Sequence, residues 1–132
     1  YKEQIARNGL TDRVIVKNEF VADADLRKYF GAADLIVQPY KTATQSGVTQ
    51  VAFHFEKPCL VTNVGGLGEI IHDGKMGYAV VPQADAIAKA LVDYYENERQ
   101  EAFTKYLTKE KELYGWNIMA QAFYRILLDI EK

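Results

Sequence analysis

The 132-residue sequence has little of what marks several large protein classes. Its single cysteine, Cys59, excludes a disulfide within the chain, which favours a reducing compartment and a cytoplasmic location. No apolar run approaches the roughly 18 residues that a membrane-spanning helix needs. The net charge of -2 comes without a basic block, so no nucleic-acid partner is expected.

Patterns for metal binding and for nucleophilic catalysis are also missing. The two histidines and Cys59 do not have the spacing of metal ligands, so no metal site is expected. Neither a Gly-rich dinucleotide fingerprint nor a Walker sequence occurs, and no serine lies in a nucleophile elbow. The sequence therefore assigns no catalytic residue. Cys59 begins the apolar run 59–61 and is interpreted as a small buried hydrophobic residue.

What the sequence does contain is an alternation of short apolar segments and amphipathic segments. We expect strands at 14–16, 35–37, 59–62 and 78–81. We expect helices at 1–8, from Asp23 to Gly31, from Ser46 to about Phe55, and in three apolar faces after residue 84. This alternation predicts an α/β fold: a Rossmann-like parallel sheet with helices on both faces and a helical C-terminal extension.

The beginning of the sequence has no initiator methionine and reads as the end of a helix closed by Gly9. We therefore expect residues 1–132 to form a single partial domain of a longer protein. The composition, 48% hydrophobic and 26% charged, is that of an ordinary globular domain.

Ligands of parallel α/β sheets bind beyond the carboxyl ends of the strands, which directs attention to the loop at 39–48. Ser46 can cap the following helix, whose first N–H groups have no partner within the helix and attract phosphate. Gly47 would let a ligand approach the backbone closely. The alternative is a plain capped helix that follows a surface loop.

A second loop of interest spans 64–69. Gly65 and Gly66 permit unusual backbone angles near a ligand. Glu69 can accept hydrogen bonds from sugar or ribose hydroxyls, or it can serve only to complement the dipole of the helix it begins.

Five segments in order carry a family resemblance. They are AADLIVQPY at 32–40, ATQSGV at 43–48, KP at 57–58, TNVGGLGE at 62–69 and DGKMG at 73–77, with Trp116 further on. The series resembles the C-terminal domain of the group-1 retaining glycosyltransferases, which have the two-domain GT-B architecture.

The resemblance implies a donor-binding half that holds a nucleotide-diphosphate sugar and needs neither a metal nor another cofactor. The sugar would pass, with retention of configuration, to an acceptor glycan, lipid or small molecule held by an N-terminal domain outside this sequence. The implied diphosphate site is Ser46, Gly47 and Val48, and the loop of Gly65 and Gly66 is a separate candidate ligand contact. The implied sugar or ribose contacts are Thr44, Gln45, Gln50 and Glu69, and the implied base contacts are Glu19, Phe20 and Val21.

One departure from the family pattern supports an alternative function. Many members carry two glutamates seven residues apart near this helix start. The matching positions here are Thr42 or Ala43, and Gln50 or Val51, depending on the register. The alternative is a non-catalytic Rossmann-like module that binds a nucleotide or a protein partner.

The resemblance also predicts how a partial domain behaves. The chain alone should be inactive and could self-associate, and the full-length enzyme would be cytoplasmic or peripheral at the inner membrane face. In the family, two strands lie between the strand matching 14–16 and the strand matching 35–37. Those two strands have no counterpart in this sequence. We therefore expect the segments 14–16 and 35–37 to pair directly with each other, or another chain to fill the gap between them.

Overall fold

The computed structural model describes residues 1–113 and 116–130, and it confirms the α/β prediction. The chain folds in the order α1 (Lys2–Arg7), α2 (Asp23–Ala32), β1 (Ile36–Gln38), α3 (Gly47–His54), β2 (Cys59–Thr62), α4 (Leu67–Ile70), β3 (Gly77–Val80), α5 (Ala84–Glu96), α6 (Arg99–Leu113) and α7 (Trp116–Ile130). The three strands form a parallel sheet in the order β1-β2-β3, with Ile36 opposite Cys59 and Cys59 opposite Gly77.

Successive side chains of β2 point to opposite sides of the sheet, so both faces present apolar groups, and both are covered by helices. One cluster packs Cys59 and Val61 of β2 against the helical residues Phe30, Ala52 and Leu67 and against Ile71, which follows α4. The other packs Leu60 and Tyr78 of the sheet against helical residues Ala90, Tyr94 and Phe103. All four residues of β2 are buried, as expected for a central parallel strand.

Cys59 confirms the interpretation of a buried small hydrophobic residue. Its side chain has no exposed surface, and burial raises the pKa of the thiol to about 12, against a smaller opposing effect of its hydrogen bond with Gln38. The thiol is therefore protonated and unreactive at neutral pH.

Several boundaries shift by one or two residues from the predictions. β1 begins at Ile36, whose N–H donates to the Pro58 carbonyl, and it extends to Gln38. β3 begins at Gly77, and Val81 is left exposed. The N-cap of α2 is Ala22, and Asp23 is the first helical residue rather than the cap.

The predicted strand at 14–16 is wrong. These residues have no ladder partner, and Ile15 is 88% exposed. The Val14 N–H donates to the Leu10 carbonyl within a turn, so it is not available to a neighbouring strand. β1 pairs only with β2, so the first of the two expected arrangements, direct pairing of 14–16 with β1, does not form. The other arrangement, in which another chain fills the gap, stays a prediction. A β-branched run forms a strand only where an adjacent strand offers backbone partners, and local propensity does not replace that partner.

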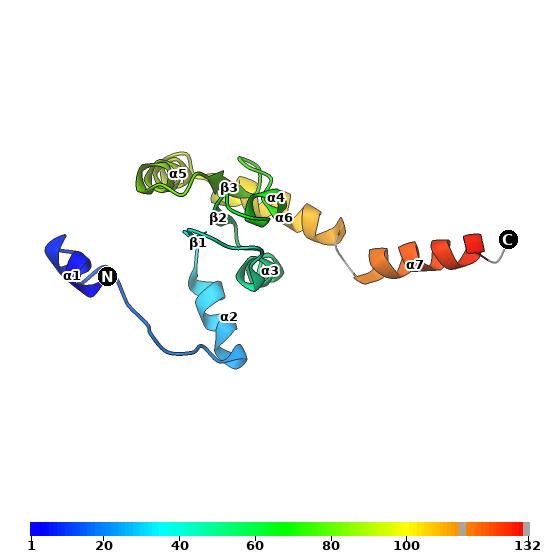
Figure 1. The fold of residues 1–132 in the computed structure, drawn as a ribbon, viewed down its shortest axis with the longest axis horizontal. Helices are drawn as coiled ribbons and strands as arrows, with labels where there is room; N and C mark the ends of the chain where they lie inside the picture. Colours follow the sequence, from blue (N-terminus) through cyan, green and yellow to red (C-terminus); the bar gives the residue numbers. More distant parts are fainter. Residues whose placement is uncertain (114–115, 131–132) are drawn as a thin grey trace.

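The C-terminal helices differ in how they pack. α5 lies on the sheet and α6 contacts α5, and Tyr94, Phe103 and Leu107 of these two helices are almost fully buried. α7 extends away from the sheet (Figure 1). Its predicted apolar face exists, but Phe123 and Leu127 are 63% and 58% exposed.

The side chain of Trp116, which carries part of the family resemblance, lies outside the described residues. None of the described helices is both long and apolar enough to cross a membrane.

Candidate functional site

The two loops singled out by sequence touch each other at the carboxyl ends of β1 and β2. The Gly66 N–H donates to the Thr44 carbonyl at 2.9 Å. Gly65 has a φ of +54°, and a β-carbon at this position would overlap the Ala43 carbonyl oxygen. Only glycine fits here, so the close approach of the loops depends directly on the sequence.

Three of the four predicted sugar or ribose contacts gather around this junction, and the fourth, Gln50, does not. A β-carbon placed on Gly66 would lie 3.1 Å from the Thr44 carbonyl oxygen, 3.9 Å from Cγ of Gln45 and 4.0 Å from Oε2 of Glu69. The structure thus brings Thr44, Gln45 and Glu69 together with both loop glycines.

Ser46 is the N-cap of α3, as predicted. Its hydroxyl oxygen accepts a hydrogen bond from the Val48 N–H at 3.2 Å. This bond already occupies one of the N–H groups assigned to phosphate, so a ligand would have to share or displace it. Gly47 is exposed, and a β-carbon there would have no protein atom within 4 Å. The helix start is therefore open to a ligand at Gly47.

The opposite end of α3 is anchored by a cation. The Lys111 ammonium donates to the His54 carbonyl at 2.8 Å and pairs with Glu56 at 3.1 Å. A positive charge complements the negative end of a helix dipole, as a bound phosphate would complement its positive end.

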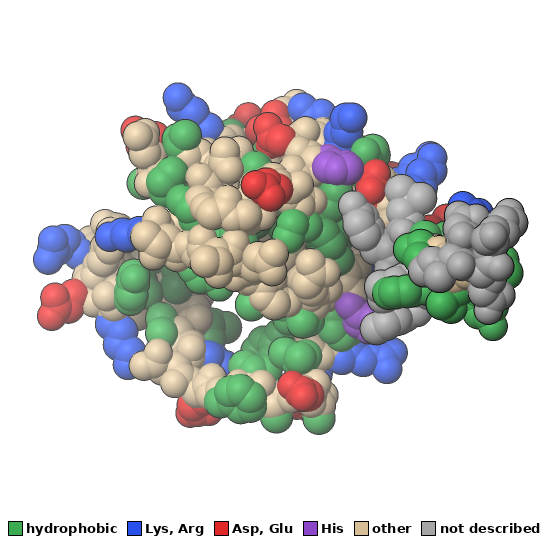
Figure 2. Space-filling view, turned by 45° about the vertical axis from the view of Figure 1, so that its right-hand side comes forward, with side chains coloured by type: hydrophobic (Ala, Val, Ile, Leu, Met, Phe, Trp, Pro, Cys, Tyr) green, Lys and Arg blue, Asp and Glu red, His purple; other side chains and the backbone are tan. Residues whose placement is uncertain are grey.

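Gln50 and Glu69 line a cavity of about 720 Å³ between α3, α4 and α6. Its apolar lining includes Phe53 and Leu107. Figure 2 shows the two histidines on this face of the molecule, and both His54 and His72 line the cavity.

The histidines contact neighbouring rings. His54 is exposed and packs edge-on against Phe55, with 5.1 Å between the ring centroids. His72 is exposed, and its Nδ1 lies 3.1 Å from the Tyr106 hydroxyl and 3.6 Å from the Glu110 carboxylate. Among the residues that the structure describes, no group of three or more potential ligands could hold a metal ion.

The predicted base contacts lie elsewhere in the fold. Glu19, Phe20 and Val21 occupy an extended segment before α2, and Phe20 is 93% exposed. Within residues 1–113 and 116–130, no hydrogen bond joins this segment to either loop. Their role in base binding stays a prediction.

Sequence reasoning missed three residues beneath the loops. The buried polar side chains of the described chain are Gln38, Thr49 and Thr62. The position of Gln38 inside the apolar run LIVQ was a signal, because a polar residue in a buried strand needs a hydrogen-bond partner. The structure supplies that partner in Thr49.

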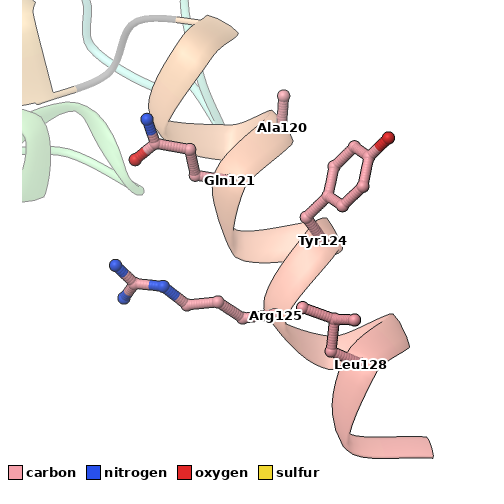
Figure 3. A pocket seen from close by; sticks show the side chains of 5 residues that line it. All are labelled: Ala120, Gln121, Tyr124, Arg125 and Leu128. Carbon is pink, nitrogen blue, oxygen red and sulfur yellow. The ribbon is translucent and has the colours of Figure 1, made fainter. Parts of the chain in front are cut away.

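A depression on α7 is separate from this site. It is lined by Ala120, Gln121, Tyr124, Arg125 and Leu128 (Figure 3). All five belong to one helix, which extends away from the sheet and its loops.

Comparison with known proteins places the fold in a family. The family model described as "Glycosyl transferases group 1" matches residues 1–97. The chain is 32% identical over 110 residues to a D-inositol 3-phosphate glycosyltransferase of Paenarthrobacter aurescens (strain TC1), an alignment that covers 82% of this chain and 27% of that protein.

Two solved structures share the fold. Sucrose-phosphate synthase from Thermosynechococcus elongatus matches 98% of this chain and 34% of its own, with a TM-score of 0.78 and 23% identity. The match to a glycosyltransferase from Rickettsia africae ESF-5 covers 99% of this chain and 35% of that protein, with a TM-score of 0.73 and 22% identity. The chain thus spans about a third or less of each of these proteins. The family match over residues 1–97, together with the parallel α/β sheet, shows that the chain belongs to the group 1 glycosyl transferases and has the fold of their GT-B domains.

Proposed function

We propose that the joined loops bind the diphosphate and sugar of a nucleotide-diphosphate sugar, and that the full-length protein transfers this sugar to an acceptor with retention of configuration. The observation that carries the proposal is the hydrogen bond between Gly66 and Thr44, which places a glycine loop beside the open N-terminus of α3. The names of the relatives, a D-inositol 3-phosphate glycosyltransferase and a sucrose-phosphate synthase, agree with sugar transfer.

The diphosphate would lie against the start of α3. The N–H groups of Gly47 and Val48 and the dipole of the helix favour negative charge there. Negative charge grows on the diphosphate as the sugar leaves, so donors that are already in place stabilise the transition state more than the ground state. Lys41, exposed in the same loop, would add a positive charge if it turns inward.

Sugar and ribose hydroxyls would meet the side chains around Gly66. Glu69 and Gln45 lie beside this glycine, and Gln50 lies one turn into α3. A carboxylate accepts hydrogen bonds from hydroxyls, and an amide both donates and accepts. The nucleoside base would meet Glu19, Phe20 and Val21, and the acceptor glycan or lipid would bind a domain outside this chain.

The proposal requires no metal. Backbone N–H groups would take the role that a divalent cation has in other sugar-nucleotide enzymes. Turnover by the full-length protein should therefore persist after treatment with EDTA.

A second candidate is a module that binds a nucleotide without catalysis. It is favoured by the absence of a carboxylate at residues 42–43 and 50–51, where many relatives have one. Both candidates predict nucleotide binding, and only the first predicts turnover.

The test uses the full-length protein that contains this chain. Calorimetric titration with UDP, GDP and ADP measures binding, and release of nucleoside diphosphate from the corresponding sugar nucleotides measures transfer. Binding with turnover supports the enzyme, and binding without turnover supports the module. An absence of binding to all three nucleotides would contradict both.

A further inference from the structure

Buried polar side chains are concentrated at one place in the described part of the chain. Gln38 is 3% exposed, Thr62 is 1% exposed and Thr49 has no exposed surface. They come from the last residue of β1, the last residue of β2 and the first turn of α3. All three therefore lie directly beneath the loop 39–46.

Their hydrogen bonds connect the two ends of that loop to the sheet. Oγ1 of Thr49 lies 2.9 Å from Nε2 and 3.3 Å from Oε1 of Gln38, so β1 is joined to the first turn of α3. The Thr62 hydroxyl donates to the Tyr40 carbonyl at 2.6 Å, so β2 holds the start of the loop. The bond from Gly66 to Thr44 then fixes the middle.

Apolar residues would fill the same space without the cost of burying polar groups. Hydrogen bonds differ from apolar contacts in being directional, so they specify where a backbone segment lies and not only that it is buried. This loop carries the residues that the proposed function assigns to the donor.

We propose that Gln38, Thr49 and Thr62 are positioning residues, which hold the loop 39–46 and the start of α3 in the arrangement that receives the donor diphosphate. The inference rests on the proposed function for its ligand. A loop held in place before binding loses less conformational freedom when the ligand arrives, so affinity is higher. None of the three needs to touch the ligand.

A purely structural role would give a different result, and Tyr94 provides the control. The Tyr94 hydroxyl donates to the Asp34 carbonyl at 2.9 Å, and the side chain is 1% exposed in the cluster that contains Leu60 and Tyr78, away from the loop 39–46. Tyr94→Phe, like Thr62→Val, removes a buried hydroxyl that donates to a backbone carbonyl, with little change of shape. The Thr62 hydroxyl also lies 3.4 Å from the Gln38 carbonyl oxygen, at the end of strand β1. If stability alone matters, both variants should affect the loop equally.

The first experiment needs no ligand. Hydrogen exchange of the backbone amides across 40–50 is compared in the full-length wild type, Thr62→Val and Tyr94→Phe. We expect exchange in this segment to become at least several-fold faster in Thr62→Val and to stay at the wild-type rate in Tyr94→Phe. Unchanged exchange in Thr62→Val, or equal acceleration in both variants, would overturn the inference.

The second experiment measures affinity for UDP, GDP and ADP by calorimetry. We expect about tenfold weaker binding in Thr62→Val, wild-type binding in Tyr94→Phe, and recovery of binding in Thr62→Ser, which keeps the hydroxyl. The double variant Gln38→Leu/Thr49→Val should regain stability relative to either single change, because no buried polar group is left unpaired. Its affinity should stay low.

The outcomes separate the two proposals. If the wild type binds a nucleotide and Thr62→Val binds it equally well, the positioning role is wrong and the proposed function stands. If the wild type binds none of the three nucleotides, the proposed function fails, and hydrogen exchange still decides whether these residues position the loop.

Discussion

Adjacent residues at the start of α3 have separable roles. Ser46 stabilises the helix, because its hydroxyl oxygen accepts the Val48 N–H. Gly47 has no side chain, so the space beside its backbone stays open to a ligand. Substitutions at the two positions should therefore affect different measurements.

Gly47→Val should weaken nucleoside-diphosphate binding more than it weakens folding. The valine side chain would point into space free of protein atoms and would hold a phosphate off the backbone. Loss of one charge-assisted hydrogen bond costs about 1.5–3 kcal/mol, or roughly tenfold to a hundredfold in affinity. Calorimetry of the full-length protein measures the affinity, and thermal unfolding checks the fold.

Ser46→Ala is the matched control for that variant. It removes the cap and should cost about 1 kcal/mol in the free energy of unfolding, with a smaller effect on affinity. Unchanged affinity in a folded Gly47→Val variant would place the phosphates elsewhere, at the loop of Gly65 and Gly66.

Gly65→Ala should destabilise the protein more than Gly74→Ala does. Both glycines have positive φ, at +54° and +71°, so alanine is strained at either position by about 1–3 kcal/mol. At Gly65 the new β-carbon also overlaps the Ala43 carbonyl, whereas at Gly74 no atom lies within 4 Å. Denaturant unfolding of the two variants measures the difference in the free energy of unfolding. Equal destabilisation of both variants would show that the loops containing Gly65 and Ala43 can move apart without loss of stability.

At the scale of elements, one carboxylate ties three of them together. The Tyr78 hydroxyl of β3 donates to Asp93 of α5 at 2.5 Å, and Arg99 of α6 lies 3.2 Å from the same carboxylate. Asp93 is half-buried and paired, because β3 and α6 converge on this part of α5.

Asp93 should contribute stability that disappears in acid. The hydrogen bond from Tyr78, followed by that from Arg99, lowers the pKa of Asp93 below its ordinary value of 3.8. A carboxylate with a lowered folded-state pKa stabilises the fold above the unfolded-state pKa and loses that contribution as pH falls through the folded-state value.

Thermal unfolding between pH 7 and pH 2 tests this. Asp93→Asn should be less stable than wild type at pH 7, and the difference should shrink below pH 4. Asp12→Asn, at an exposed turn position, is the control and should follow the wild type at every pH. A constant difference between Asp93→Asn and wild type across the range would show that the charge contributes nothing.

At the scale of the whole molecule, much of the apolar surface is not covered by the described residues. α1 buries no residue, Ile15 and Phe20 are almost fully exposed, and α7 presents Phe123 and Leu127 to solvent. The chain spans 27% of the curated relative and 34–35% of the solved structures it resembles. The proposed reaction needs an acceptor site, which we expect to lie in a domain outside this chain.

We therefore expect the 132-residue chain alone to show no sugar transfer. Release of nucleoside diphosphate from UDP-, GDP- and ADP-sugars would be measured for the chain and for the full-length protein under the same conditions. Activity only in the full-length protein fits the prediction. Turnover by the isolated chain would show that residues 1–132 contain the whole catalytic apparatus.

The same chain should self-associate more than the full-length protein does, because its exposed apolar residues would find partners in other copies. Static light scattering at increasing concentration would show a mass that rises only for the isolated chain.

Local sequence determined most of the elements around the core. The run at 59–62 forms the central strand because four consecutive apolar or small residues suit burial on both faces. Ser46 begins α3 because its side chain satisfies an N–H that the helix itself leaves without a partner. The same reasoning located both loops of the candidate site, since parallel strands present their carboxyl ends at one edge.

Tertiary structure decided what depends on a partner distant in sequence. Residues 14–16 have the composition of a strand but lack a neighbouring strand, so they form none. The contact of Gly65 with Ala43, the pairing of Gln38 with Thr49 and the bond from Thr62 to Tyr40 all join residues from different elements. Sequence specified the side chains that can make these bonds, and the packing of α3 and the loops against the sheet determined which of them meet, because hydrogen bonds require distance and direction that only the folded chain supplies.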